Sequence, residues 1–307
     1  MSMSQLATEA TTVSIGTSNA SDTSALVRRR RLPASWLTPV LTLPAAVLIT
    51  VFFAIPIVQV IILSFTDPQA GLSNYAWLFS TPLIGQAAVG TFLISLSVTI
   101  VCLLMAYPYA YLMTIVSART RSVMTMLIMV PLWSSILVRT LAWVVLLQDS
   151  GPINGMLTAI GLGPLQLIRT PLGVGIGMSQ VLLPFMVMPL YSALSRIDTR
   201  LVTAAKSLGA HPVLAFFRVY LPLSRPGIFS GCLTVFILAL GFYIIPSLLG
   251  SPQDTMLSAM IQLQVSGFLA WGRGSALGVV LLAATLVALI VVARLGKNTR
   301  TSKGGAK

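Results

Sequence analysis

The side chains that most often carry out chemistry in proteins are scarce and widely separated in this sequence. His211 is the only histidine, Glu9 is the only glutamate, and Cys102 and Cys232 both fall inside apolar runs. A metal site needs several such ligands at set spacings, and acid–base catalysis needs a cluster of polar groups. We therefore expect no bound metal, no cofactor and no enzymatic activity of the chain itself.

Phosphate-binding loops are also missing. The sequence has no G-x-x-x-x-G-K-[ST] segment, which is the loop that usually holds the phosphates of ATP. Gly173, Gly175 and Gly177 have some of the spacing of a dinucleotide loop, but no strand surrounds them. Gly173 with Gly177, and Gly274 with Gly278, instead have the four-residue spacing that lets membrane helices approach closely.

A few polar or aromatic side chains near apolar runs are candidates for a substrate pathway. Arg139 lies deep inside a run, where an ionisable group is costly and is a functional hypothesis by default. Either it contacts an anionic group of a substrate or partner permease, or it bonds helix-end carbonyls near the outer interface. Trp143, one turn further, either shares that surface or belongs to the interfacial aromatic belt. Asp149 and Asp254 lie at the outer ends of runs, and they are either carboxylates of the pathway or solvated acids of the loops. Tyr243 is the remaining pathway candidate.

Long apolar runs must position these residues. The chain has 307 residues, of which 56% are hydrophobic and only 8% charged, whereas about a quarter are charged in soluble proteins. About 20 apolar residues cross a bilayer as a helix, and six runs meet that length. Prolines inside several runs predict kinked helices that line cavities. The fold prediction is an all-α polytopic membrane protein with six transmembrane helices. The runs cover residues 41–65, 87–113, 123–147, 172–194, 228–249 and 276–294.

Positive charge is placed asymmetrically around these runs. The formal net charge is +13, but the Lys and Arg residues lie in short clusters between apolar runs, which argues against a nucleic-acid partner. Most of them flank alternate loops and both chain ends, and positive loops stay in the cytoplasm, so both termini are predicted to be cytoplasmic. The expected organisation is a disordered basic tail (1–35), a six-span domain (36–295) with a cytoplasmic loop (196–226), and a basic tail (296–307).

The cytoplasmic loop between the fourth and fifth runs has helix signals at both ends of a short segment. Asp198 is suited to cap a helix, and Leu201, Ala204, Ala205 and Leu208 then fall on one helical face. Gly209 is suited to end it in a left-handed conformation. Such an element either docks a partner or packs under its own bundle.

A second short helix is predicted after that glycine. Pro212 suits its first turn, and Val213, Phe217 and Tyr220 are expected along one side. Leu221 and Pro222 are expected to end or bend this helix before the next run.

The segment TAAKSLGA, followed by Leu-Pro, resembles the EAA motif of binding-protein-dependent ABC importer permeases of type I. The matching residues are Ala204, Ala205, Gly209, Leu221 and Pro222, while Thr203 stands where the family has Glu. A Thr hydroxyl can still bond locally. RTLAW from Arg139 and residues 241–271 resemble the spermidine/putrescine branch.

The resemblance implies which residues dock an ATPase and which partners assemble. The ATPase-docking set comprises Asp198, Thr203, Ala204, Ala205, Gly209, Ala210, Phe217, Leu221 and Pro222. Two copies of an ATPase carrying ATP and Mg²⁺, a second permease in a hetero- or homodimer, and an extracytoplasmic solute-binding protein are implied, in the bacterial inner membrane.

The implied function is import of a small charged solute, with polyamines first and phosphonates or opines as alternatives. A secondary transporter or channel that needs no ATPase is the competing function class, but it normally leaves buried ionisable relays or broken-helix pairs.

Overall fold

The computed structural model describes residues 37–251 and 255–301. The predicted tail of residues 1–35 and the candidate Asp254 lie outside these ranges. The chain separates into two units, residues 1–55 and residues 56–307, which are described separately. In the first unit, helix α1 (Leu37–Ile49) continues into a π-helical turn, η1 (Thr50–Ala54), and the side chains of residues 42–54 are exposed.

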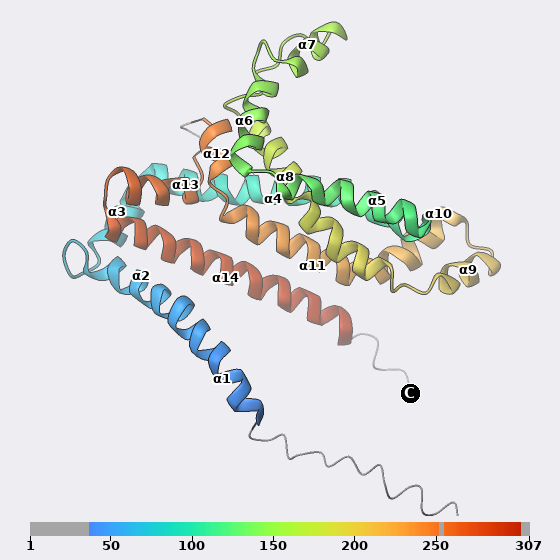
Figure 1. Cartoon of the computed structure of the whole chain (residues 1–307), viewed down its shortest axis with the longest axis horizontal. Helices are drawn as coiled ribbons and strands as arrows, with labels where there is room; N and C mark the ends of the chain where they lie inside the picture. The colour runs from blue at the N-terminus through green and yellow to red at the C-terminus, as the bar shows by residue number, and fades with distance from the viewer. Residues whose placement is uncertain (1–36, 252–254, 302–307) are drawn as a thin grey trace, which may run out of the picture. The chain divides into compact units, whose positions relative to one another are not determined.

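All regular secondary structure in the described residues of the second unit is helical (Figure 1). Its main membrane-length helices are α4 (Pro82–Ile115), α8 (Pro171–Leu194), α11 (Leu221–Leu240) and α14 (Trp271–Thr301). Shorter helices connect and flank them. They are α2 (Ile55–Thr66), α3 (Ser73–Ser80), α5 (Ala118–Met129), η2 (Val130–Trp133), α6 (Ile136–Leu147), α7 (Pro152–Ala159), α9 (Thr199–Ser207), α10 (Pro212–Ala215), η3 (Phe216–Tyr220), α12 (Ile244–Leu249), α13 (Leu257–Gln262) and η5 (Leu263–Gly267).

Helices α4, α8 and α11 pack against one another and form the core. On α4, Cys102, Ala106 and Ala110 are fully buried at helical spacing. Small residues also bring α11 onto α8: a Cβ on Gly227 would lie 2.5 Å from the Cβ of Ala193, and one on Gly231 would lie 2.7 Å from Met186 Sδ. Membrane helices associate through close van der Waals packing, because lipid removes the hydrophobic driving force between them. These glycines therefore determine the distance between α11 and α8.

The glycine pairs predicted from sequence behave differently from each other. A Cβ on Gly177 would meet Leu249 and Ile245 of α12, and one on Gly274 would meet Val265, so both positions are close contacts. Gly278 has only an ordinary contact at 4.0 Å. The Gly227 and Gly231 pair, with the same spacing, was not singled out from the sequence.

Six helical segments of the described chain are long and apolar enough to cross a membrane, which agrees with the predicted number. They are Thr42–Thr66, Pro82–Ile115, Ile136–Ala159, Pro171–Leu194, Pro212–Leu240 and Trp271–Ile290. Helix α14 continues to Thr301, so part of the predicted 296–307 tail is helical. Helices α4 and α8 continue through Pro108, Pro184 and Pro189.

Two predicted continuous runs are broken in the structure. Run 123–147 is divided into α5 and α6 by residues 130–135, where Pro131 removes a backbone donor and Ser134 is extended. Run 228–249 is divided into α11 and α12 at Gly241, which ends α11. The pieces α6 and α12 contact each other. Broken helices are tolerated at membrane depth where protein or a cavity satisfies the backbone.

Candidate functional site

Helix α9, in the loop between the fourth and fifth spans, begins and ends as its sequence predicts. The side-chain Oδ1 of Asp198 accepts a hydrogen bond from the backbone N–H of Arg200 at 2.9 Å. Gly209 has a φ of +89°, and the N–H of Ala210 donates to the carbonyl of Ala205 at 3.1 Å. Both ends are closed by local bonds, so this short helix is defined without help from distant residues.

The two long faces of α9 have different surroundings. Leu201 is 50% exposed and Leu208 is 89% exposed, and Ala204 between them is exposed as well. The opposite face carries Thr203 and Lys206, which line a cavity against the body of the protein. Leu201, Ala204 and Leu208 therefore form an apolar stripe on α9 that no described residue covers. Exposed apolar faces of this kind mark interaction sites.

The chain after Gly209 differs from the prediction in how it joins the next span. Helix α10 begins at Pro212 as expected. Leu221 and Pro222 do not end the helix: the π-helical turn η3 precedes them, with the N–H of Leu221 bonded to the carbonyl of Phe216, and the chain stays helical into α11. Pro222 has no N–H for the usual bond, and the wider π turn accommodates that loss.

The π turn also changes which side chains face the body. Val213 and Phe217 are each 57% exposed, whereas Tyr220 is buried, so the predicted shared side of these three residues is wrong. Ala215 is buried instead, and Phe216 packs against the core. An added residue in the turn rotates everything after it, and a count of 3.6 residues per turn therefore fails across η3.

An aromatic cluster anchors this segment to α4. The ring of Phe216 meets Tyr107 edge-on at 6.0 Å between centroids and stacks on Tyr220 at 5.6 Å. Tyr111 meets Tyr220 edge-on at 5.3 Å, and the hydroxyl of Tyr107 lies 3.2 Å from Ser224 Oγ on α11. The sequence analysis did not predict this cluster. The four-residue spacing of Tyr107 and Tyr111, which places both rings on one face of α4, could have indicated it.

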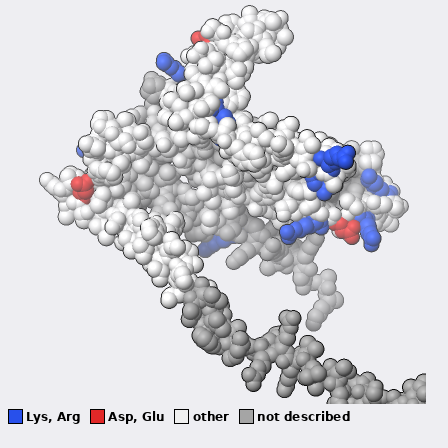
Figure 2. All heavy atoms as spheres, viewed as in Figure 1, with Lys and Arg blue, Asp and Glu red and all other residues white. Residues whose placement is uncertain are grey.

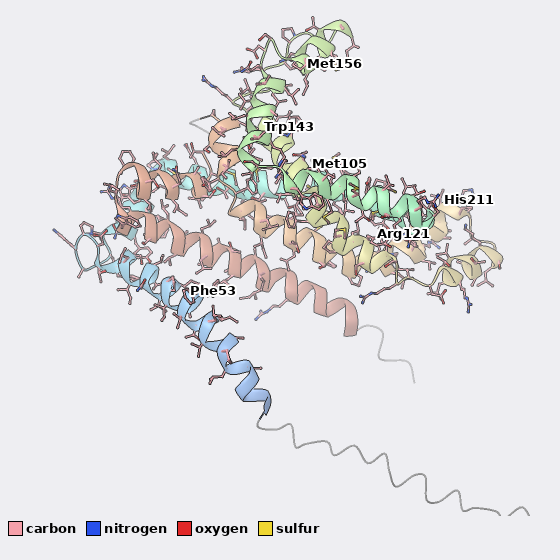
Figure 3. All side chains as sticks on the ribbon, viewed as in Figure 1. Phe53, Met105, Arg121, Trp143, Met156 and His211 are labelled. Atoms are coloured by element: carbon pink, nitrogen blue, oxygen red, sulfur yellow. The ribbon has the colours of Figure 1, made fainter. Side chains whose placement is uncertain are left out.

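The outer pathway candidates are only partly brought together. Trp143, which is labelled in Figure 3, lies one turn after Arg139 on α6. Its side chain packs against the core. Tyr243 precedes α12, which contacts α6, and is 43% exposed. Asp149 is exposed beyond the end of α6. Arg139, Trp143 and Tyr243 therefore belong to contacting elements, and Asp149 does not join them.

The guanidinium of Arg139 is incompletely bonded. Its Nη2 donates to the carbonyl of Ser134 at 3.2 Å. Its Nε and Nη1 are buried and have no hydrogen-bond partner among the described residues. One carbonyl bond leaves most of the donors of a charged group unsatisfied, which is costly in an apolar surrounding.

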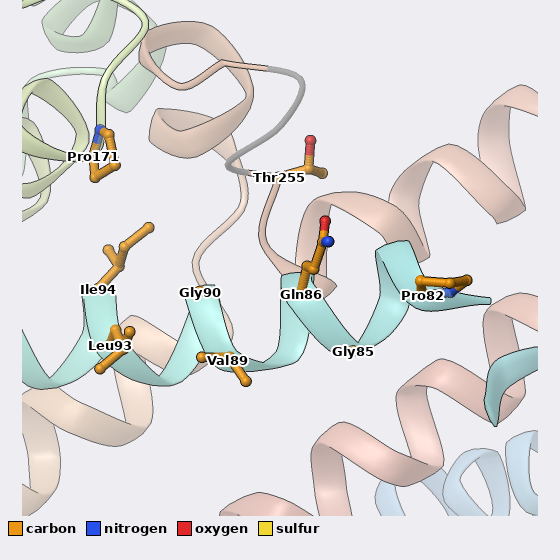
Figure 4. A pocket seen from close by; sticks show the side chains of 9 residues that line it. All are labelled: Pro82, Gly85, Gln86, Val89, Gly90, Leu93, Ile94, Pro171 and Thr255. Atoms are coloured by element: carbon orange, nitrogen blue, oxygen red, sulfur yellow. The ribbon is translucent and has the colours of Figure 1, made fainter. Parts of the chain in front are cut away.

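A cavity of about 750 Å³ lies on the N-terminal half of α4, opposite Pro171 and Thr255 (Figure 4). Gln86 contributes a polar side chain, and Gly85 and Gly90 leave the helix surface open. A second cavity of about 400 Å³ shares Leu93 and Ile94 with it and continues along α8. Of the predicted pathway residues that the structure describes, none lines either cavity. The small residues Gly85 and Gly90 of α4 were the feature of the sequence that could have indicated these cavities.

Among the residues that the structure describes, no group of three His, Cys, Asp or Glu side chains could hold a metal ion. The described features are instead six hydrophobic spans, two broken runs, two neighbouring cavities and a short amphipathic helix outside the bundle. This arrangement defines a polytopic helical membrane protein.

Comparisons with known proteins identify its family. Residues 110–301 match the family described as "Binding-protein-dependent transport system inner membrane component". The spermidine/putrescine transport system permease protein PotB of Haemophilus influenzae is 36% identical over 222 residues, covering 72% of this chain and 77% of the relative. PotB of Escherichia coli is 33% identical over 220 residues, covering 71% and 80%.

The fold comparison agrees. A chain in the crystal structure of a bacterial alginate ABC transporter, in complex with an alginate pentasaccharide-bound periplasmic protein, superimposes with a TM-score of 0.70 at 20% identity. The match covers 89% of this chain and 97% of that chain. The chain belongs to the binding-protein-dependent transport family: it is the multi-pass inner-membrane permease subunit of an ABC importer, which works with an ATPase and a binding protein.

Proposed function

We propose that this permease imports polyamine-type cations, with α9 as its ATPase-docking element. Two ATPase copies would serve this chain and a second permease, as a hetero- or homodimer, and both termini would be cytoplasmic. The observation that supports docking is the exposed apolar stripe of Leu201, Ala204 and Leu208, on a hairpin joined to α4 and α11 through Phe216. ATP-driven movement of the ATPases would reach the spans through this joint.

Charge placement supports the orientation. Figure 2 shows Lys and Arg gathered over the end of the second unit formed by α5, α9 and α10. Arg119 and Arg121 on α5 and Arg200 and Lys206 on α9 contribute to this basic end. Positive loops are retained in the cytoplasm, and the same end carries the docking helix.

The names of the PotB relatives support a polyamine cargo. Within α4, α8 and α11 the described sequence has no Asp or Glu, so a cation would be met there by aromatic rings and carbonyl oxygens. Phosphonates and opines are the alternative cargoes.

Docking is tested by adding a bulky charge to the apolar stripe. Ala204→Arg should abolish association of the purified permease with its ATPase and remove uptake. Ser207→Arg adds the same group to an exposed position of α9 outside the stripe and the cavity lining, and it should retain association. Equal association of both variants would contradict the docking assignment.

Cargo is tested by uptake in proteoliposomes that contain the permease complex, ATP and the binding protein. Radiolabelled putrescine and spermidine should accumulate in an ATP-dependent way. Accumulation of a phosphonate or an opine, without either polyamine, would overturn the cargo and leave the docking proposal intact.

A further inference from the structure

A third cavity, on the cytoplasmic side of the fold, has no role in the proposed docking or transport. A cavity of about 350 Å³ lies between α9 and the body of the protein. One wall is the face of α9 that carries Thr199, Thr203 and Lys206, and the opposite wall includes Arg121 of α5 and Tyr191 of α8. Its volume is within the range of small-ligand sites.

Two cations share this cavity without an opposite charge. Arg121 and Lys206 both line it, and none of the described lining residues is Asp or Glu. Asp198, nearby in the chain, is exposed and its side chain caps α9 through the N–H of Arg200. Like charges at one partly enclosed site repel each other, and an anion between them removes that cost.

The Arg121 side chain is held in place before any ligand arrives. Its Nε donates to the carbonyl of Met113 at 3.0 Å, and its Nη2 donates to the carbonyl of Val116 at 3.2 Å. These bonds to the end of α4 fix the guanidinium plane. Arg121 is labelled in Figure 3. A fixed guanidinium is well suited to an oxyanion, because little rotational freedom is lost on binding.

The side chain at position 203 explains why the counter-charge is missing. Thr203 occupies the position at which the EAA motif has Glu, and its hydroxyl donates within α9 to the carbonyl of Thr199 at 3.3 Å. A Glu at this position would place a carboxylate on the cavity wall. With Thr, the polar side chains of the cavity are cations and hydroxyl groups, so a counter-ion would come from solution or from a lipid.

We propose that this cavity binds a small tetrahedral oxyanion, such as phosphate or a phosphate ester, which bridges Lys206 on α9 and Arg121 on α5. No residue of α9 is fully buried, so the bridge would hold the helix against the body of the protein. The consequence for coupling rests on α9 being the docking element, but the binding site itself does not. The docked ATPase is not the occupant, because the apolar stripe lies on the opposite face of the helix.

Binding is tested on the full purified chain in a detergent without phosphate groups. Sodium phosphate or sulfate is titrated against sodium chloride at constant ionic strength, and the midpoint of thermal unfolding is measured. The midpoint should rise and saturate with phosphate or sulfate, because a ligand of the folded state stabilises it. Chloride should have no saturable effect.

Variants locate the site. Lys206→Gln should weaken the apparent affinity for phosphate about tenfold or more, the loss expected when a charged hydrogen-bond donor is removed. Thr203→Glu should abolish the phosphate response by supplying an internal carboxylate. Arg200→Gln removes the same charge from α9 outside the lining and should respond as the wild type does. An equal phosphate response in Lys206→Gln and the wild type, or none in the wild type, would overturn the proposal.

The source of the phosphate group is distinguished in nanodiscs. If free phosphate is the ligand, the wild-type response persists in phosphatidylglycerol nanodiscs. If a lipid phosphate is the ligand, the detergent response disappears in those nanodiscs, because the site is already filled. A saturable response together with normal ATPase binding by Ala204→Arg would support the oxyanion site while contradicting the docking assignment.

Discussion

The ring of Phe216, in the π turn after the α9–α10 hairpin, meets the ring of Tyr107 on α4 edge-on at 6.0 Å between centroids. Edge-to-face pairs at this distance stabilise beyond the area they bury. This contact joins the α9–α10 hairpin to a helix of the core, whereas neighbouring Phe217 is exposed. Through this contact, movement of the hairpin would be transmitted directly to α4.

Phe216→Ala should weaken that connection. We expect a loss of about 2–4 kcal/mol in the free energy of unfolding, from the truncation of a large, partly buried ring, and fewer substrate molecules transported per ATP hydrolysed. Both quantities can be measured with the purified complex in proteoliposomes. Phe217→Ala removes the same side chain from the exposed side, and it should change ATPase affinity more than unfolding. Unchanged coupling in Phe216→Ala would argue against the mechanical role.

Gly227→Ala should separate α11 from α8. The added methyl would lie 2.5 Å from the Cβ of Ala193, which cannot move without its backbone, so overpacking should cost about 1–3 kcal/mol. Thermal unfolding in detergent measures the change. Gly155→Ala is the control, because nothing lies within 4 Å of a Cβ there, and it should be neutral or stabilising by up to about 1 kcal/mol. Equal midpoints would show that the core accommodates the methyl group.

Arg139→Gln should reduce uptake without lowering the unfolding midpoint. Two of its guanidinium nitrogens have no partner among the described residues, which favours the pathway interpretation over a purely structural one. Uptake at a saturating concentration of loaded binding protein tests this expectation. Arg169→Gln, an exposed position, should transport normally. A large drop in stability in Arg139→Gln would instead support the structural interpretation.

Asp67→Ala should destabilise the start of α14. Its Oδ2 accepts a hydrogen bond from the N–H of Gly272 at 2.6 Å, in the first turn of that helix. Loss of a capping carboxylate typically costs about 0.5–2 kcal/mol. Hydrogen exchange in the first turn of α14 should accelerate. Asp149→Ala removes an exposed acidic side chain and should leave exchange in α14 unchanged.

Local chemistry determined a large part of this protein from the sequence. The number of spans follows from apolar length, and the two ends of α9 follow from Asp198 and Gly209, because each depends on residues within a few positions of one another. The resemblance of the segment around Ala204 and Ala205 was likewise sufficient for the family.

Only the tertiary structure decided which face of α9 is exposed, which aromatic rings meet Phe216, and how Arg121 comes to share a cavity with Lys206. The sequence also did not predict the breaks before α6 and α12 or the π turn before Pro222. These features shift the helical register, which a periodicity of 3.6 residues per turn assumes to be constant. Contacts between residues far apart in the sequence depend on how whole helices pack, and the close approach of Gly227 and Gly231 to α8 determines that packing in the core.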